Sequence, residues 1–128
     1  MSSIQPSFVI ASCHPKQLAE FYGKVNDVEI QKGISSSHFL VPLNNGLNIQ
    51  IYQPSKSREK LEKGRSVALC FQKQPSPHPL QIVCEWSLQL KEIGANAIGV
   101  PTNESFGAEA WVADPERNQF LIFVPLLN

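Results

Sequence analysis

The chain has 128 residues, 42% of them hydrophobic, and its 11 Lys and Arg residues balance 11 Asp and Glu residues, so its net charge is zero. This length predicts one domain with its own core, and the charge balance offers no overall attraction to nucleic acid or to a membrane surface. No apolar run approaches the roughly 20 residues of a spanning helix, and residues 1–6 lack the segments of a signal peptide. The three cysteines are odd in number, no pair of them has metal-site spacing, and nothing in the sequence suggests secretion. We therefore expect Cys13, Cys70 and Cys84 to be reduced thiols in a cytoplasmic protein.

The first half of the chain predicts a strand, a helix and then three strands. The apolar run at 7–12 favours a first strand, and Pro15 opens a helix to about residue 26 in which apolar residues recur every three or four positions. Asn44-Asn45-Gly46 is typical of a hairpin because these residues accept positive φ. We interpret the polar segment at 53–65 as a solvated loop. The three strands are predicted at 28–31, 38–43 and 47–52.

The second half repeats this order. The run at 66–71 predicts a strand, and Pro79 then opens a second helix that Gly94 ends. A turn follows the seventh strand, because Asp114 caps its own backbone and Asn118 tolerates a left-handed conformation. The unbroken apolar run after this turn predicts a last strand that is buried on both faces. The three strands of this half are predicted at 97–100, 109–113 and 119–124.

The repeated order of strand, helix and three strands predicts the fold class. Such an internal duplication indicates an α+β protein with helices on one face of a curved sheet. We predict a single domain over residues 1–128. Its first module covers about 6–54, a linker covers 55–64, and the second module covers about 65–126.

Three stretches, at 10–22, 48–54 and 113–121, carry a resemblance to a known family. A strand, a short turn and a helix containing Phe21-Tyr22 open the pattern, and an Asp-Pro turn with a final strand closes it. Through the order and spacing of these motifs, the chain resembles the vicinal oxygen chelate superfamily, which includes glyoxalases, bleomycin-resistance proteins and extradiol dioxygenases. The resemblance implies two βαβββ modules whose mixed sheet curls around a cleft, with the helices outside.

The resemblance also implies a metal held by one residue on each of four cleft strands. A catalytic divalent site needs about three good protein ligands and one open position. Two hydroxyls, one amide and one alkyl side chain do not provide them, and a shift of one residue in either direction is no better. We therefore expect neither a metal nor a cofactor. The four positions here are Ser7, Gln50, Ser66 and Leu121.

The cleft strands of the family predict a neutral lining. Apolar walls with a few amide and hydroxyl groups suit a neutral, partly hydrophobic small molecule. No Arg or Lys stands at these positions to pair an anion. The side chains that share the cleft-facing parity are Ser7, Val9, Asn48, Gln50, Tyr52, Ser66, Ala68, Cys70, Leu121 and Phe123.

Further candidates stand on or beside these strands, each with two interpretations. His38 is either a polar contact in the cleft or a half-buried structural residue. Cys70 lacks a local partner that would activate a thiol, which favours an inert buried cysteine. Glu109, which alternates with Trp111, is either a general base or a surface charge on an edge strand. All four are included among the candidate ligand-binding residues.

These observations favour a metal-free small-molecule-binding protein, by analogy with bleomycin-resistance proteins. One alternative is a lyase, isomerase or dioxygenase-type enzyme of the same superfamily with an atypical active site. It is either a metal-free lyase or isomerase that uses Glu109 or His38, or a metal lyase whose ligands stand at other positions than the four named above. Another is a structural dimer module with a filled cleft. Because strands of the duplicated modules leave unpaired edges, we expect a homodimer. We expect no nucleic-acid or membrane partner.

Overall fold

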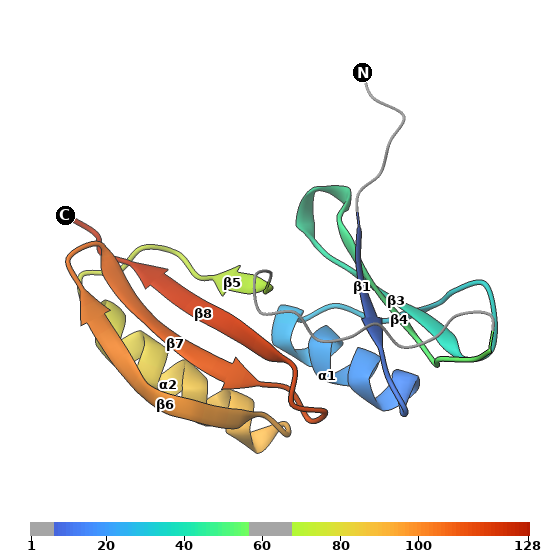
Figure 1. Ribbon diagram of the computed structural model, residues 1–128. Helices are drawn as coiled ribbons and strands as arrows, with labels where there is room; N and C mark the ends of the chain where they lie inside the picture. Colours follow the sequence, from blue (N-terminus) through green and yellow to red (C-terminus); the bar gives the residue numbers. More distant parts are fainter. Residues whose placement is uncertain (1–6, 57–67) are drawn as a thin grey trace. The chain divides into compact units, whose positions relative to one another are not determined.

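The computed structural model describes residues 7–56 and 68–128, so Ser66, one of the predicted site residues, lies outside the described part (Figure 1). The chain divides into two compact units, Met1–Lys63 and Gly64–Asn128, which are described separately. The single-domain assignment and its module boundaries stay a prediction. Of the described helices, neither is long and apolar enough to cross a membrane.

The first unit is a four-stranded mixed sheet with one helix (Figure 1). Its strand order is β1-β4-β3-β2, with β1 parallel to β4 and the other pairs antiparallel. The elements are β1 (Ser7–Ala11), α1 (Pro15–Asn26), β2 (Gln31–Lys32), β3 (His38–Pro42), the 3-10 turn η1 (Asn44–Gly46) and β4 (Asn48–Tyr52).

Helix α1 covers one face of this sheet, and its apolar spacing explains why. Leu18 and Tyr22 are four positions apart and lie fully buried against a sheet whose own helix-facing residues include Ile49 and Ile51. Each fully buried side chain of this kind contributes about 1.5–3 kcal/mol relative to leaving it exposed. The helix therefore fixes one face of the sheet and leaves the opposite face open.

The second unit repeats this topology. Its strand order is β5-β8-β7-β6, with β5 parallel to β8 and the remaining pairs antiparallel. The elements are β5 (Cys70–Gln72), α2 (Pro79–Glu92), β6 (Asn96–Glu104), β7 (Gly107–Ala113) and β8 (Gln119–Pro125). The predicted α+β class with two βαβββ modules is thereby confirmed.

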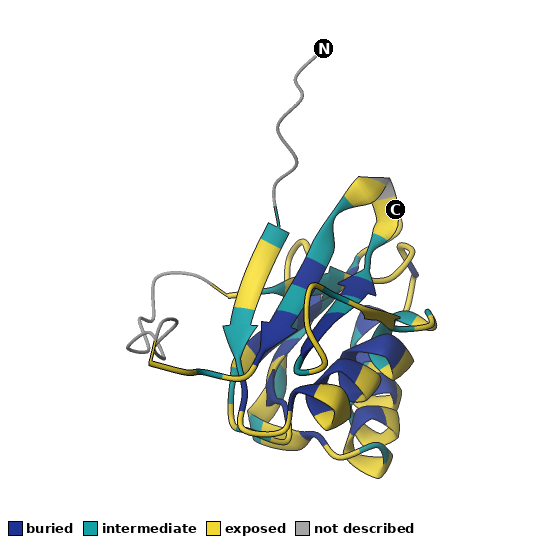
Figure 2. Ribbon diagram, turned by 90° about the vertical axis from the view of Figure 1, so that its right-hand side faces the viewer, coloured by how far each residue is buried: buried dark blue, intermediate teal, exposed yellow. Residues whose placement is uncertain are grey.

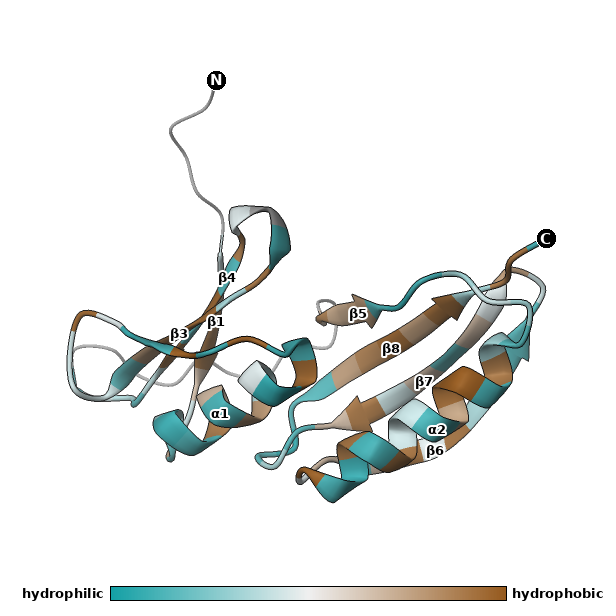
Figure 3. Cartoon of the chain, turned by 180° about the vertical axis from the view of Figure 1, so that it is seen from behind, coloured by the Kyte–Doolittle hydropathy of each residue, from teal (hydrophilic) through white to brown (hydrophobic). Residues whose placement is uncertain are grey.

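Strand β8 is buried on one face only, so the prediction of two buried faces is wrong. Phe120, Ile122 and Val124 are fully buried on the side that α2 covers. Leu121 and Phe123 are half-buried on the other side. Figure 2 colours the ribbon by burial, and Figure 3 shows the hydrophobic colour along β8. The unbroken apolar run arises because the open face of this strand also carries apolar side chains.

The predicted strand at 28–31 is wrong for most of its length. Only Gln31 and Lys32 pair with β3. The Val28 amide donates to the Gly23 carbonyl of α1 (2.9 Å), and a Cβ on Gly23 would lie 3.0 Å from Cγ2 of Ile30. The alternating pattern thus reflects packing of an extended segment on the helix rather than pairing with a strand.

Other boundaries differ by a few residues. Within the described residues, the predicted strand at 66–71 is paired only at Cys70–Gln72. The predicted strand at 97–100 extends over Asn96–Glu104, with a register irregularity near Gly99, whose φ is +73°. The expected hairpin at Asn44–Gly46 forms a 3-10 turn, and Gly46 has the positive φ that the prediction required.

Both helices begin with the pattern Ser-x-His-Pro, at Ser12–Pro15 and Ser76–Pro79. The hydroxyl of each buried serine accepts a hydrogen bond from the backbone amide of the histidine, at 2.9 Å in the first case and 3.0 Å in the second. The two histidines share nearly the same backbone angles, with φ −136° and ψ 69° against φ −127° and ψ 60°. Each proline then occupies the first helical turn, where no amide donor is needed.

The turn between β7 and β8 is built around Asp114, which is completely buried. Its Oδ1 accepts hydrogen bonds from the amides of Glu116 (2.8 Å) and Asn118 (3.0 Å), and its Oδ2 accepts one from Nδ2 of Asn118 (2.8 Å). The left-handed residue is Arg117, with φ +70°, and not Asn118 as the sequence suggested. The Asn118 side chain instead binds the carboxylate that organises the turn.

Candidate functional site

The candidate residues of the first unit lie on the open face of its sheet. Strand register places Gln50 between Val9 of β1 and Leu40 of β3, with Ser7 and His38 in the neighbouring rows. Asn48 pairs with Ser7, and Tyr52 pairs with His38. Residues of one parity share a sheet face, so all five candidates of this unit lie on the same face. Their role in binding a ligand stays a prediction.

A chain of hydrogen bonds links three of these side chains. Nε2 of His38 lies 3.0 Å from Oε1 of Gln50, and Nε2 of Gln50 donates to the Ser7 hydroxyl oxygen at 2.8 Å. At the far end, the Ile34 amide donates to Nδ1 of His38 at 2.9 Å. This Ile34–His38–Gln50–Ser7 chain is the main polar feature of the open face.

The direction of the hydrogen bonds follows from the Ile34 end. A backbone amide can only donate, so Nδ1 of His38 accepts and the neutral ring carries its proton on Nε2. Nε2 then donates to Oε1 of Gln50, which leaves the Gln50 amide nitrogen as the donor to Ser7. Every group between Ile34 and Ser7 therefore has its role fixed.

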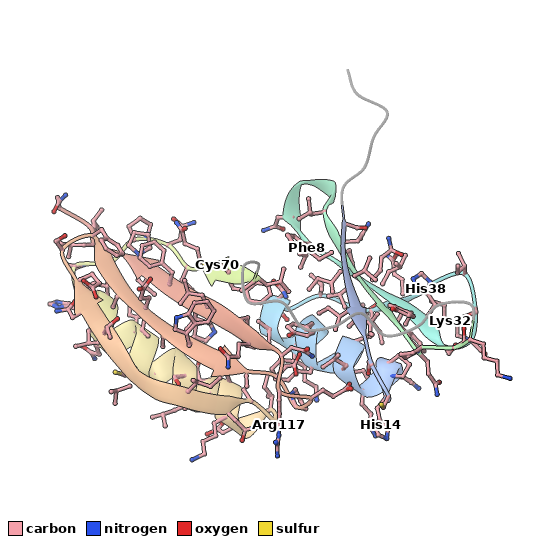
Figure 4. All side chains as sticks on the ribbon, viewed as in Figure 1. Phe8, His14, Lys32, His38, Cys70 and Arg117 are labelled. Atoms are coloured by element: carbon pink, nitrogen blue, oxygen red, sulfur yellow. The ribbon has the colours of Figure 1, made fainter. Side chains whose placement is uncertain are left out.

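His38 is buried, with only 4% of its surface exposed, although it stands on the open face (Figure 4). The turn after β2 covers it: a Cβ added to Gly33 would lie 1.8 Å from Nδ1 of His38, and 2.5 Å from Cε1. His38 is therefore more deeply buried than the half-buried structural residue of the sequence-based interpretation. The sequence did not reveal that Gly33 and Ile34 contact His38. A glycine five residues before a histidine is only a weak signal of such a contact.

These residues do not fit the metal that the resemblance implies. Ser7 and Gln50 are bonded to each other, and Oε1 of Gln50 accepts from a ring N–H. The position on β8 holds Leu121, whose side chain has no donor atom. Within residues 7–56 and 68–128, no three His, Cys, Asp or Glu side chains cluster closely enough to hold a metal ion. The donor set is thus too poor for a divalent cation.

The open face of the second unit carries several apolar side chains. One row joins Cys70, Leu121 and Trp111, and the next joins Phe123 and Glu109. Trp111 is 44% exposed. Glu109 is half-buried on β7, which lies between β8 and β6, so the interpretation as an edge-strand charge is wrong. Phe106, which the sequence analysis did not include, packs against Phe123 with ring centroids 5.8 Å apart.

Cys70 is an exposed free thiol, so the expectation of a buried cysteine is wrong (Figure 4). Neighbouring atoms nevertheless withdraw part of its water, and this desolvation raises the pKa of the Cys70 thiol. The negative charge of Glu109 raises that pKa further. Both effects disfavour the thiolate, which is the reactive form of cysteine. The site thus stabilises the protonated thiol, in agreement with the expected lack of activation.

Two surface depressions of the second unit lie elsewhere, around its proline-rich loop. One of about 610 Å³ is lined by residues 72–77 and Ile82. Another of about 360 Å³ is formed by residues 77–81 with 103–105 and Leu126. Neither contains a predicted site residue. Both are open hollows beside a loop, so the polar chain of the first unit and the apolar rows of the second remain the better candidates.

Comparison with solved structures identifies the fold. A glyoxalase/bleomycin resistance protein/dioxygenase family enzyme from Burkholderia phytofirmans PsJN is similar over 94% of this chain and 97% of its own, with a TM-score of 0.74 at 19% identity. A glyoxalase/bleomycin resistance protein from Albidiferax ferrireducens T118 matches over 96% and 98%, with a TM-score of 0.65 at 15% identity. Protein ATC0852 from Agrobacterium tumefaciens matches over 98% and 100%, with a TM-score of 0.74 at 17% identity.

The chain therefore has a vicinal oxygen chelate-type fold, as the sequence resemblance implied. No protein-family model matches the sequence, and no curated protein matches it significantly. The identities to the solved structures are low, so the likeness concerns the fold, and the chemistry has to be argued from the side chains.

Proposed function

We propose that this protein binds a neutral, partly hydrophobic small molecule on the open faces of its sheets without using a metal. The observation that carries the proposal is the hydrogen-bonded chain of Ser7, Gln50 and His38. Two members of this chain, Ser7 and Gln50, stand at positions where the resemblance places metal ligands. A third such position is occupied by Leu121, which cannot bind a metal. Because Oε1 of Gln50 and the Ser7 oxygen already accept hydrogen bonds, they are poorly placed to coordinate an ion, which supports binding without a metal.

The remaining chemistry of the open faces supports a neutral ligand. In the described part of the chain, no Lys or Arg stands at the open-face positions of β1, β4, β5 and β8. A phosphate or dicarboxylate would thus lack a pairing charge. Val9, Trp111 and Phe123 instead offer apolar surface, and pockets that combine apolar walls with a few polar groups are typical of small-molecule sites.

An enzyme without a metal is the second candidate, and Glu109 is the residue that favours it. Its side chain is half-buried on the open face, and a lone carboxylate can act as a general base without a metal. His38 is a poor base, because Nδ1 accepts from Ile34 and Nε2 donates to Gln50. An enzymatic role for this site would therefore rest on Glu109, and conversion of a bound ligand that Glu109→Gln abolishes would reveal it.

Two measurements on the purified untagged protein test the binding proposal. Elemental analysis should give far less than one transition metal per chain. A thermal-shift screen of neutral aromatic and aliphatic compounds should raise the melting temperature, because a ligand at 100 times its Kd adds about 2.7 kcal/mol of stability.

Variants then locate the bound molecule. Leu121→Glu should weaken binding because it places an unpaired charge in an apolar surface. The matched control is Leu88→Glu, which makes the same change at a residue of α2 that is 64% exposed. Gln50→Leu should weaken polar ligands more than apolar ones. About one metal ion per chain, or tight binding of an anionic metabolite that Leu121→Glu leaves unchanged, would refute the proposal.

A further inference from the structure

We propose that the ligand carries a carbonyl oxygen and that the Ser7 hydroxyl donates a hydrogen bond to it. This inference rests on the proposed binding function and adds the chemical class of the bound molecule. It also assigns Ser7 a specific role, that of the donor which orients the ligand on the open face of the first unit.

The argument begins at the buried end of the hydrogen-bonded chain. His38 is covered by Gly33 and Ile34, and both of its ring nitrogens are used. A ligand cannot approach through this end. Ser7, at the other end, is half-exposed on the first strand of the sheet. The chain therefore presents the Ser7 hydroxyl as its terminal group.

The fixed directions then determine what Ser7 can offer. The Ser7 oxygen already accepts a hydrogen bond from the Gln50 amide. Among the described residues, the hydroxyl proton of Ser7 has no acceptor of its own. A hydroxyl carries one proton and two lone pairs. A ligand donor would use the second lone pair and still leave that proton without a partner. A ligand acceptor satisfies the proton, and donation from Gln50 strengthens the hydroxyl as a donor because linked hydrogen bonds polarise one another.

The surroundings of Ser7 and Gln50 select a neutral acceptor with an apolar body. Val9, two residues along β1, is 48% exposed, and Leu40 lies beside Gln50 on the other side of the strand ladder. These aliphatic side chains offer contact to hydrocarbon but no positive charge. A carbonyl of a ketone, ester or amide combines the acceptor with such a body, whereas a carboxylate would bring an unpaired charge.

The first test reads the direction of the hydrogen bonds without any ligand. Two-bond proton–nitrogen NMR spectra of the ¹⁵N-labelled protein at pH 7.5 distinguish the two neutral imidazole tautomers from the cationic ring. The His38 signals, assigned with a His38→Gln variant, should show the neutral ring with its proton on Nε2. A proton on Nδ1, or a cationic ring, would reverse or break the chain and overturn the inference while leaving the binding function intact.

The second test uses acetophenone and ethylbenzene, which differ by one carbonyl oxygen. Their dissociation constants are measured by NMR titration of the wild type and of Ser7→Ala. Loss of one hydrogen bond should weaken acetophenone about three- to tenfold. The affinity for ethylbenzene should change less than about twofold. Ser7→Thr keeps the hydroxyl and should retain the wild-type affinity for acetophenone, which controls for damage to the strand.

The outcomes separate the two proposals. If both compounds bind and Ser7→Ala weakens them equally or not at all, the carbonyl inference is wrong and the binding function stands. If neither compound binds and the neutral compounds of the thermal-shift screen also fail, the binding function itself is wrong, and this inference fails with it.

Discussion

Replacing Gly33 with alanine should disrupt the polar chain of the open face although none of the side chains in that chain is replaced. The φ of Gly33 is not in the left-handed region, so its backbone would accept alanine. The obstacle is the His38 ring: the new Cβ would lie 1.8 Å from Nδ1, 2.5 Å from Cε1 and 2.6 Å from Cγ. Real Cβ atoms essentially never approach below 3.0 Å, so the ring or the turn must move.

The cost follows from what the displaced ring loses. His38 would give up its hydrogen bonds with Ile34 (2.9 Å) and Gln50 (3.0 Å). Each buried group left without a partner costs about 1–3 kcal/mol, and overpacking adds about 1–3 kcal/mol. Partial relaxation reduces the sum, so we expect the free energy of unfolding to fall by about 3 kcal/mol.

Urea denaturation monitored by circular dichroism measures this change, and a double-mutant cycle isolates its cause. In a His38→Ala background the ring is absent, so Gly33→Ala should cost less than about 0.5 kcal/mol. The coupling energy between the two sites should then be about 2–3 kcal/mol. If Gly33→Ala lowered the free energy of unfolding equally in both backgrounds, or by less than about 1 kcal/mol in the wild type, the His38 ring would not be the reason why position 33 requires glycine.

Three further predictions concern the rest of the chain. The raised pKa of Cys70 means a smaller thiolate fraction at pH 8, so the rate at which iodoacetamide alkylates this thiol should rise at higher pH. Glu109→Gln should lower the pKa of Cys70 and accelerate its alkylation at pH 8, and an unchanged rate would contradict the role of that carboxylate. Asp114→Ala should lower the free energy of unfolding by about 2–4 kcal/mol in urea denaturation, since the turn loses three hydrogen bonds, and a change within 0.5 kcal/mol would disprove this. Because β1 and β5 lie at sheet edges within their units, light scattering at tens of micromolar should give twice the chain mass, and the mass of a single chain would refute a dimer.

The sequence predicted the fold well where local chemistry and tertiary packing agree. Pro15 and Pro79 begin the two helices as predicted, because a proline at the first helical turn needs no partner for its missing amide. It failed where burial and strand pairing differ. Val28 and Ile30 alternate like a strand but pack on α1, and periodicity alone does not reveal which partner an extended segment has.

The candidate site was predictable as a face but not as a network. Strand parity placed Ser7 and Gln50 together, because alternate residues share a face in any strand. Their hydrogen bond depends on side-chain rotamers. The burial of His38 depends on a turn that passes over it, which involves a glycine and a backbone amide. Neither contact leaves a periodic trace in the sequence.

The matching starts of α1 and α2 make the two segments interchangeable parts. Each four-residue segment supplies the acceptor for its own histidine amide and the proline that opens its helix. The two differ only at the second position, Cys13 in one and Pro77 in the other. Transplanting either segment into the other half would thus change a single side chain. The shared segment fits the internal duplication that the repeated order of elements indicates.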